Sequence, residues 1–321
     1  MHVAKLYRYP VKGLSPERLG AVQIPSNEGF PIDRQYALLF TDADFDPAAP
    51  IWLAKANFIM LMLHEQIAQL KTHYDEANKT LEVKHPDGSI FNFKLDNSAD
   101  RSALENFFYD FMPQHLKHKP RLVQAAGHHF SDKAPKYVSL INLASLRELE
   151  QEWHEDLDPL RFRANIYIDD AKPFSELEWV GKTIQLGQVT AMVMLRNGRC
   201  SATNVDPNTG LRDRNIPGKL RKTFGHKDLG IYLSVTQGGL LREGDSVVIS
   251  PSVDIATQRP SPAVYKDTDE LLICTACYYL FDPRLLNVSW HTSQDLPESW
   301  RCPDCGANRD TLRSAKENMN N

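Results

Sequence analysis

The chain has 321 residues, of which 42% are hydrophobic and 24% charged, and its formal net charge is −4. This length allows two or three domains, and the composition is that of a folded globular protein rather than a disordered chain. The charge balance gives no electrostatic basis for binding nucleic acid or an anionic membrane, and no apolar run approaches the ~20 residues of a membrane-spanning helix. The first residues have the composition of a β-strand and lack the charged, apolar and small-residue segments of a signal peptide. We therefore expect a cytoplasmic protein with no nucleic-acid or membrane partner.

The first 95 residues are rich in predicted strands. Alternation and β-type composition predict strands over 3–9, 19–24, 35–40 and 67–73. A hairpin follows, because the strand-like runs 80–84 and 90–95 flank the turn sequence Pro86-Asp87-Gly88. Asp100 is then predicted to cap a helix that ends at Met112.

The following 150 residues predict a second β-rich region. Helical spacing of apolar residues indicates a helix after Asn142 that includes Trp153. Strands are predicted over 162–168, in a hairpin over 184–195 that bends at Gly187, and over 244–249. The pattern favours a mostly β body, barrel-like, with a few helices.

The C-terminal part begins after a stretch rich in proline and polar residues, which predicts a linker. From residue 267 onward there are nine acidic and five basic residues, so this part carries the whole net charge of −4. The predicted divisions are an N-terminal β domain at 1–95, a second β-rich domain at 96–250, the linker at 251–266 and a small domain at 267–321.

Four cysteines in the small domain form two C-x-x-C knuckles. Cys274 and Cys277 are separated from Cys302 and Cys305 by 24 residues. Each knuckle brings two thiolates toward one tetrahedral metal, so the two pairs predict a complete four-sulfur site. Zinc and a single iron both accept this ligand set, and the spacing leaves the metal open.

The residues around the knuckles resemble rubredoxin over about forty positions. An aromatic-Asp-Pro sequence ends at Pro283, and a Leu-Pro-x-x-Trp-x-Cys-Pro-x-Cys-Gly-Ala sequence begins at Leu296. The resemblance implies one iron that carries one electron, with a structural zinc ribbon as the alternative. Tyr278 stands where rubredoxins usually have glycine, and a positive φ there would cost about 1 kcal/mol or more.

The fifth cysteine, Cys200, follows a predicted strand and begins a polar loop. Arg199 precedes it, and a neighbouring arginine favours the thiolate, the form that attacks electrophiles and binds soft metals. On this chemistry alone, an ordinary half-buried cysteine is an equal alternative.

The sequence around Cys200 resembles the metal-binding segment of MOSC domains, in which the cysteine is the protein ligand to molybdenum. The matching positions after the cysteine are Thr203, Val205, Asp206, Pro207, Thr209 and Gly210. Residues 161–166 resemble a strand of the same family, with Ala164 in place of its usual proline, and 225–232 and 244–247 resemble its closing strands. Residues 6–13 and 29–38 resemble the MOSC N-terminal β-barrel domain. The implied fold is therefore mostly β with some α: two β-barrel domains and a rubredoxin-like knuckle domain.

The resemblance also implies a cofactor site for molybdopterin. Cys200 is the implied metal ligand and catalytic residue. The cofactor contacts that we expect are Lys12, Gly13, Arg34, Ser139, Arg163, Asn165, Arg199, Thr203, Asn204 and Asp206. Fixed cations and amides suit a phosphate-bearing cofactor, and an arginine can hold phosphate through two hydrogen bonds. For each charged residue, the alternative is a solvated surface position.

The implied activity is a molybdenum-dependent reduction of small N-oxygenated compounds, such as N-hydroxylated bases and amidoximes. The tail iron would relay electrons from a flavoprotein or ferredoxin-type reductase, and tethering would raise its effective concentration. The alternative is a non-catalytic carrier of molybdenum cofactor or sulfur with a structural zinc ribbon.

Overall fold

The computed structural model describes residues 1–40, 43–53, 55–116, 118–250, 272–274, 280–281, 296–298, 300, 302 and 308–314. Its contacts divide the chain into two compact units, one of residues 1–53 with 57–253 and one of residues 54–56 with 254–321. The linker predicted at 251–266 lies outside the described residues. None of the described helices is long and apolar enough to cross a membrane.

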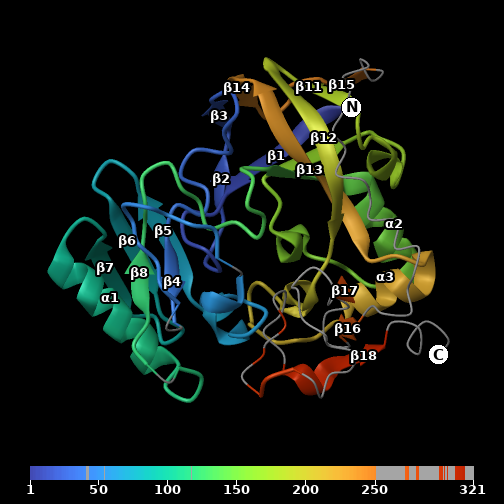
Figure 1. Cartoon of the computed structure of the whole chain (residues 1–321). Coiled ribbons are helices and arrows are strands. Elements are labelled where there is room, and N and C mark those ends of the chain that lie inside the picture. The colour runs from blue at the N-terminus through green and yellow to red at the C-terminus, as the bar shows by residue number, and fades with distance from the viewer. Residues whose placement is uncertain are drawn as a thin grey trace. The chain divides into compact units, whose positions relative to one another are not determined.

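The first unit is built on an eight-stranded sheet (Figure 1). In spatial order the strands are β15 (Val247–Ser250), β11 (Thr183–Leu186), β12 (Val189–Gly198), β13 (Asp228–Gln237), β9 (Val138–Asn142), β10 (Ile166–Asp169), β1 (His2–Arg8) and β2 (Glu17–Leu19). β9 and β10 are parallel, and every other neighbouring pair is antiparallel. The N-terminal strand thus lies in the same sheet as strands from the second half of the unit, with His2 opposite Asp169.

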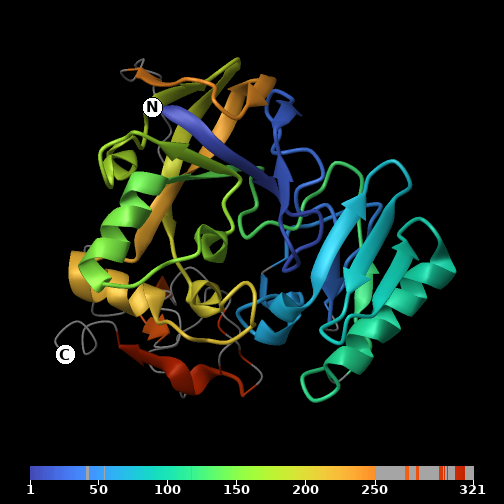
Figure 2. The ribbon, with the colours of Figure 1, turned by 180° about the vertical axis from the view of Figure 1, so that it is seen from behind.

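Both faces of this sheet are covered by apolar side chains. Successive strand residues point to opposite faces, so Ile166 and Ile168 belong to one buried cluster and Tyr167 to another. The second cluster includes residues of α2 (Leu143–Trp153) and α3 (Ile216–Phe224), such as Leu146 and Leu220, which pack on that face (Figure 2). Two short strands, β3 (Ala21–Ile24) and β14 (Gly239–Arg242), form a separate ribbon.

A smaller region of the first unit lies between β2 and β9 in the sequence. It contains the sheet β5 (Lys71–Asp75), β6 (Thr80–Lys84) and β7 (Ile90–Lys94), the pair β4 (Ala37–Leu39) with β8 (Arg121–Val123), and α1 (Ser98–Phe111). Leu81, Phe93, Leu104 and Phe108 share one core, which places α1 against this sheet (Figure 1). Helix α1 and strand β8 therefore pack with the elements that precede them.

Several predicted elements are confirmed, and the fold is mostly β with a few helices, as expected. The hairpin of β6 and β7 forms at the predicted turn, and α2 begins directly after Asn142, whose side chain accepts a hydrogen bond from the Ala144 amide at 3.1 Å. The N-cap of α1 was predicted wrongly. Asn97 caps it, because its side-chain oxygen accepts from the amides of Ala99 and Asp100 at 2.9 and 3.1 Å.

Two further differences have local causes. The strand predicted over 67–73 begins only at Lys71, because residues Glu65–Gln69 form the 3-10 helix η2. Helix α3 was not predicted. Asn215 caps it, Pro217 stands in its first turn, and Gly225 ends it at φ 76°.

The described part of the second unit is a three-stranded antiparallel sheet in the order β17 (Leu280–Phe281), β16 (Leu272–Cys274), β18 (Leu312–Ser314). A 3-10 turn, η9 (Arg309–Thr311), leads into β18. Leu272 and Leu312 are buried, as are Cys274 and Cys302. Whether this small sheet belongs to a rubredoxin-like domain stays a prediction.

Candidate functional site

Cys200 stands where β12 ends and a tight turn begins. It is the N-cap of the 3-10 helix η5 (Ser201–Asn204), and its carbonyl accepts hydrogen bonds from the amide and the hydroxyl of Thr203 at 3.1 and 2.8 Å. The thiol is free and partly exposed. The predicted contact Thr203 therefore fixes the backbone of the cysteine turn, and the sulfur remains accessible.

Arg199 anchors this turn to the rest of the domain. Its side chain is buried, with Nε donating to the Leu229 carbonyl at 2.7 Å and Nη1 to the Phe162 carbonyl at 3.0 Å, while Nη2 also donates to Leu229. Burial lowers the pKa of the guanidinium. Arg199 was predicted to contact the cofactor, but its side chain donates to backbone carbonyls instead. Its role in this structure is therefore to position Cys200.

Gly230 makes room for this anchor. Its φ is +78°, and a Cβ there would lie against the Leu140 carbonyl oxygen, 2.7 Å from Ile141 Cγ1 and 3.1 Å from Arg199 Nη2. No side chain fits between β13 and β9 at this point, so only glycine allows both strands and the guanidinium to approach. The close approach became visible only with the strand pairing, although the glycine itself lies in the matching stretch 225–232.

Two arginines flank one buried aromatic ring. The guanidinium carbons of Arg34 and Arg163 lie 4.4 and 4.3 Å from the ring centroid of Tyr9, distances at which cation–π attraction is strong. Arg34 donates to Asp33 at 2.5 Å and to the Arg163 carbonyl at 3.0 Å. Both arginines have left-handed backbone conformations, with φ of 49° and 52°. Their alignment is therefore fixed by the main chain as well as by the ring.

Arg163 differs from Arg34 in having no ion pair among the described residues. Its Nη2 is buried without a hydrogen-bond partner, and burial lowers the pKa of the guanidinium to about 10. A buried donor without an acceptor is unfavourable by about 1–3 kcal/mol, and more for a charged group. An anionic ligand would supply the missing acceptor.

Lys12 and Gly13 lie on a neighbouring turn. Lys12 is buried, and its ammonium donates to the Phe130 carbonyl at 2.8 Å and to Asp132 at 2.5 Å. Gly13 has a φ of +86°, and a Cβ there would lie 3.0 Å from the Ile59 carbonyl oxygen. Glycine is therefore required at this predicted contact by the packing of the chain itself.

Ser139 and Asn165 form hydrogen bonds with each other inside the large sheet. The Ser139 hydroxyl donates to Asn165 Oδ1 at 2.8 Å, and the Asn165 amide Nδ2 donates to the Tyr7 carbonyl at 3.2 Å. Both are buried. These two predicted contacts thus join β9 and β1 to the segment that enters β10.

Asn204 and Asp206 are organised by a residue outside the predicted set, Arg161. Its buried guanidinium makes two bonds of 2.8 Å to Asp213 and one of 2.9 Å to Asp206, and it also donates to the Asn204 carbonyl at 3.3 Å. The Asn204 side chain accepts from the Ile216 amide at 2.9 Å, which ties the cysteine turn to α3. The Arg-Phe-Arg pattern at 161–163 carried the signal: its first arginine holds the loop, and its second has a buried Nη2 with no hydrogen-bond partner in the described part of the chain.

Arg212 is a second organiser that was not predicted. It donates to the carbonyls of Ser201 at 3.2 Å and Met62 at 2.6 Å, and it pairs with Glu65 at 3.1 Å. The cysteine turn is thereby tied to the smaller β region. No local pattern in the sequence indicates this tie, because the Met62 carbonyl lies 150 positions earlier in the chain.

One hydrogen bond connects the segment of Cys200 with the segment of Arg163. Arg199 precedes Cys200, and the carbonyl that Arg199 holds belongs to Phe162, the residue before Arg163. The link brings together two of the predicted site residues from segments about forty positions apart. Arg34 joins this group through its hydrogen bond to the Arg163 carbonyl.

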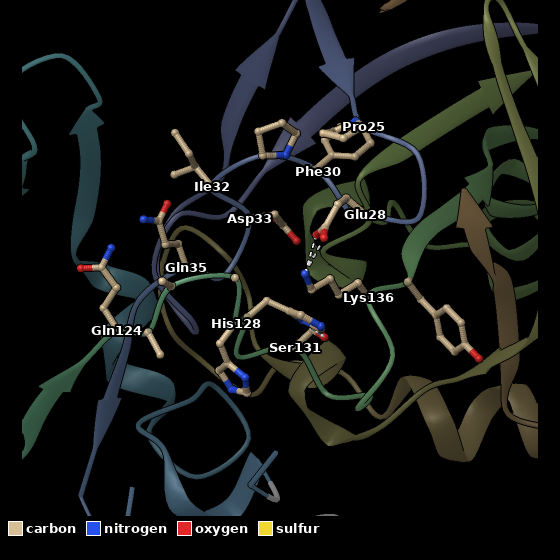
Figure 3. A pocket seen from close by; sticks show the side chains of 17 residues that line it. Pro25, Glu28, Phe30, Ile32, Asp33, Gln35, Gln124, His128, Ser131 and Lys136 are labelled. Atoms are coloured by element: carbon tan, nitrogen blue, oxygen red, sulfur yellow. Dashed lines mark hydrogen bonds and ion pairs between the residues drawn. The ribbon is translucent and has the colours of Figure 1, made fainter. Parts of the chain in front are cut away.

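A pocket of about 370 Å³ lies between the loops 25–35 and 124–137 (Figure 3). Lys136 and Glu28 bridge the two loops with N–O distances of 2.6 and 2.7 Å. Asp33, the partner of Arg34, and His129 also line it. None of these pocket residues was predicted to belong to a site, because ordinary loop residues carry no periodic signal.

Two of the four tail cysteines can be placed. Cys274 and Cys302 are buried, and Cys274 Sγ lies 3.5 Å from the Thr311 hydroxyl. Cys277 and Cys305 lie outside the described residues. Within the described part of the chain there is no group of three or more metal-ligating side chains, so the four-cysteine site stays a prediction.

Known proteins are similar to the part of the chain that contains this site. The MOSC domain family matches residues 125–248. Mitochondrial amidoxime-reducing component 1 of Danio rerio is 33% identical over 126 residues, which cover 37% of this chain and 38% of that protein. Mitochondrial amidoxime reducing component 2 of Homo sapiens is 30% identical over 141 residues, which cover 40% and 42%. The chain thus spans about two fifths of the length of these relatives.

Among solved structures, the YUAD protein from Bacillus subtilis aligns with a TM-score of 0.36 at 10% identity, over 77% of this chain and 93% of that one. The family match begins at the pocket loop that leads into β9 and ends in β15, so it includes Cys200, Arg199 and Arg163. Over residues 125–248 the chain is therefore similar to the MOSC domain family.

Proposed function

We propose that this protein is a molybdenum cofactor-dependent oxidoreductase that reduces small N-oxygenated compounds, with Cys200 as the protein ligand to the metal. The MOSC domain and the relatives named amidoxime-reducing components support the reaction class. The observation that carries the proposal is the link between a free, partly exposed thiol and the guanidinium of Arg163, whose buried Nη2 has no hydrogen-bond partner among the described residues.

The donor set fits the cofactor. A thiolate is a suitable ligand for a soft metal, and a phosphate-bearing pterin needs fixed cations. Arg163 has an unsatisfied donor, Arg34 is aligned beside it on Tyr9, and both are held by left-handed backbone conformations. Lys12 contributes further positive charge, although Asp132 already pairs with it.

When bound, the cofactor supplies the two-electron chemistry that removes oxygen from nitrogen. The protein's part is to hold the geometry. Arg199 fixes the backbone that carries the thiol, and Arg161 fixes the loop that follows it. Burial raises the pKa of Tyr9 to about 12, so the ring between the arginines stays uncharged.

The test is to measure molybdenum and activity together for Cys200→Ala and for a matched neighbour, Ser201→Ala. Among the described residues, Ser201 is contacted through its backbone carbonyl, which accepts a hydrogen bond from Arg212, so this control keeps the loop. We expect Cys200→Ala to lose both molybdenum and amidoxime reduction, and Ser201→Ala to retain them. Unchanged molybdenum content and activity in Cys200→Ala would remove this residue as the ligand.

We further propose that the tail relays electrons through one iron held by Cys274, Cys277, Cys302 and Cys305. The net negative charge of residues 267–321 suits a basic patch on a flavoprotein or ferredoxin-type reductase, so coupled turnover should fall as salt rises. Cys302→Ser should spare reduction driven by an artificial dye and stop reductase-coupled turnover. An equal fall in both assays would mean that the tail is structural, and zinc without molybdenum in the purified protein would favour the carrier.

A further inference from the structure

Glu176 is a buried carboxylate without a direct cationic partner in the described part of the chain. It belongs to the 3-10 helix η4 (Ser175–Glu178), and its exposed fraction is 0%. An ionised carboxylate is strongly unfavourable in the interior of a protein unless neighbouring groups compensate its charge. No motif singled this residue out, so its contacts have to explain its position.

Three neutral groups donate hydrogen bonds to this carboxylate. The Ser145 hydroxyl lies 2.8 Å from Oε1, Asn142 Nδ2 lies 3.3 Å from Oε2, and the backbone amide of Gly230 is the third donor. Burial raises the pKa of the Glu176 carboxyl, and these hydrogen bonds oppose the rise. Each of the three groups presents a hydrogen, so the ionised form is the one that they stabilise.

The amide of Gly230 belongs to the same peptide group as the carbonyl of Leu229. Arg199 Nε donates to this carbonyl at 2.7 Å, and Nη2 donates to it as well. Arg199 is buried and forms no ion pair with a carboxylate among the described residues. One planar peptide group therefore lies between a buried anion on its N–H side and a buried cation on its C=O side. Its dipole is favourable for both charges, and hydrogen bonds in such a chain strengthen one another in the protein interior.

The backbone that leads into η4 is strained. Phe174 has a φ of 60° and a ψ of 0°, a left-handed conformation that is unfavourable for a bulky side chain. Its amide donates at 2.8 Å to the same Ser145 oxygen whose hydrogen points to Glu176. On the other side, Arg196 Nε donates to the Leu177 carbonyl at 2.9 Å and ties η4 to β12. Strain of this kind persists only where surrounding contacts impose it, so the carboxylate is held in place.

We propose that Glu176 is a positioning residue for the candidate thiol. It holds the peptide group between Leu229 and Gly230 in the orientation that Arg199 requires, and Arg199 in turn fixes the backbone of Cys200. The inference rests on the proposed function only for the metal that this thiol binds, because the positional link itself requires no metal.

Hydrogen exchange at the cysteine turn tests this link in the purified full-length protein. The Thr203 amide donates to the Cys200 carbonyl at 3.1 Å, so its exchange rate reports the opening of the turn. Glu176→Gln keeps the size of the side chain and removes its charge. We expect the Thr203 amide to exchange about fivefold faster in this variant, the change expected for the loss of one hydrogen bond, while the amides of β6 keep their rates. An unchanged Thr203 rate, or an equal increase in β6, would overturn the proposal.

Two control variants separate this role from a local one. Glu178→Gln removes an exposed charge from the same 3-10 helix and should leave the Thr203 rate unchanged. Ser145→Ala removes a hydrogen bond on the α2 side of Glu176 but keeps the carboxylate. It should speed exchange at the start of α2 and leave the Thr203 rate within about twofold. Equal effects of Ser145→Ala and Glu176→Gln on the Thr203 amide would mean that Glu176 only supports α2, and would refute the link.

Two further measurements complete the test. If Glu176→Gln does not fold, exchange in the unsubstituted protein decides: the Gly230 and Thr203 amides should be protected to within about threefold of each other, and a difference above about tenfold would overturn the link. In cofactor-loaded protein, the EPR spectrum of partly reduced molybdenum should change in Glu176→Gln but not in Glu178→Gln. Identical spectra in both variants would refute the positioning of the thiol. Absence of molybdenum from the unsubstituted protein, with exchange as expected, would defeat the proposed function alone.

Discussion

Gly230→Ala is expected to be strongly destabilising because β13 and β9 leave no space for a side chain. A residue other than glycine at φ +78° costs roughly 1–2 kcal/mol. The new Cβ would also press on the Leu140 carbonyl oxygen and lie 2.7 Å from Ile141 Cγ1, and such overpacking adds about 1–3 kcal/mol. The free energy of unfolding should therefore fall by about 2–5 kcal/mol.

Gly225→Ala is the matched control. Gly225 has nearly the same φ, +76°, and lies in the same domain, but no atom of the described residues lies within 4 Å of the Cβ that the substitution adds. Only the conformational cost of about 1–2 kcal/mol applies there. The difference between the two variants isolates the steric effect, about 1–3 kcal/mol.

The assay is urea unfolding followed by tryptophan fluorescence, with free energies from linear extrapolation. Trp153 and Trp179 report on this domain. Arg199 Nη2 lies 3.1 Å from the added Cβ of Gly230→Ala, so this variant should also retain less molybdenum than the control. Equal losses of stability in Gly230→Ala and Gly225→Ala would refute the close approach of the two strands.

Two further predictions concern charge. Arg161→Met should lower the free energy of unfolding by about 2–4 kcal/mol, because it leaves Asp206 and Asp213 without their buried cation. The control Arg147→Met breaks a half-exposed ion pair and should lower it by under about 1 kcal/mol. Similar losses in both variants would contradict the role of Arg161. Burial lowers the pKa of His64 to about 4. The imidazole is therefore protonated in the unfolded chain at a higher pH than in the folded protein. The free energy of unfolding should fall by up to about 3 kcal/mol as the pH decreases from about 6.5 to 4. His64→Gln should reduce that loss when unfolding is compared at pH 7 and pH 4.5, and an unchanged loss would exclude this histidine as the cause.

Sequence reasoning located most elements that have a local signal. The hairpin around Gly88 and the start of α2 follow from turn and capping residues, whose effects extend over three or four positions. The cap of α1 was misplaced by three residues, since both Asn97 and Asp100 are good capping residues and only the backbone distinguishes them. Helix α3 was missed because its nine residues contain a proline and a glycine.

The candidate site was predictable as a set of residue types but not as a set of roles. Cys200 and the cations Arg34 and Arg163 lie in motifs, and their hydrogen-bonded neighbours connect them. Arg199 and Asn165 belong to the same motifs, yet their side chains form hydrogen bonds with backbone and side-chain groups inside the fold. A motif shows which residue type a position requires, but it does not show whether a ligand or the fold itself makes the contact that requires it.

By itself, the sequence determined that the fold is mostly β, which cysteine is the candidate thiol, and that the tail cysteines form two C-x-x-C motifs. Alternation, spacing and side-chain chemistry are local properties, so they can be read along the chain. The tertiary structure alone decided that β1 joins the sheet of β9 and β10, that Arg163 Nη2 has no hydrogen-bond partner among the described residues while Arg199 has several, and that Gly230 has no room for a side chain. These features depend on atoms brought together from segments tens to more than a hundred residues apart. No pattern along the chain encodes such distances, since they arise from packing.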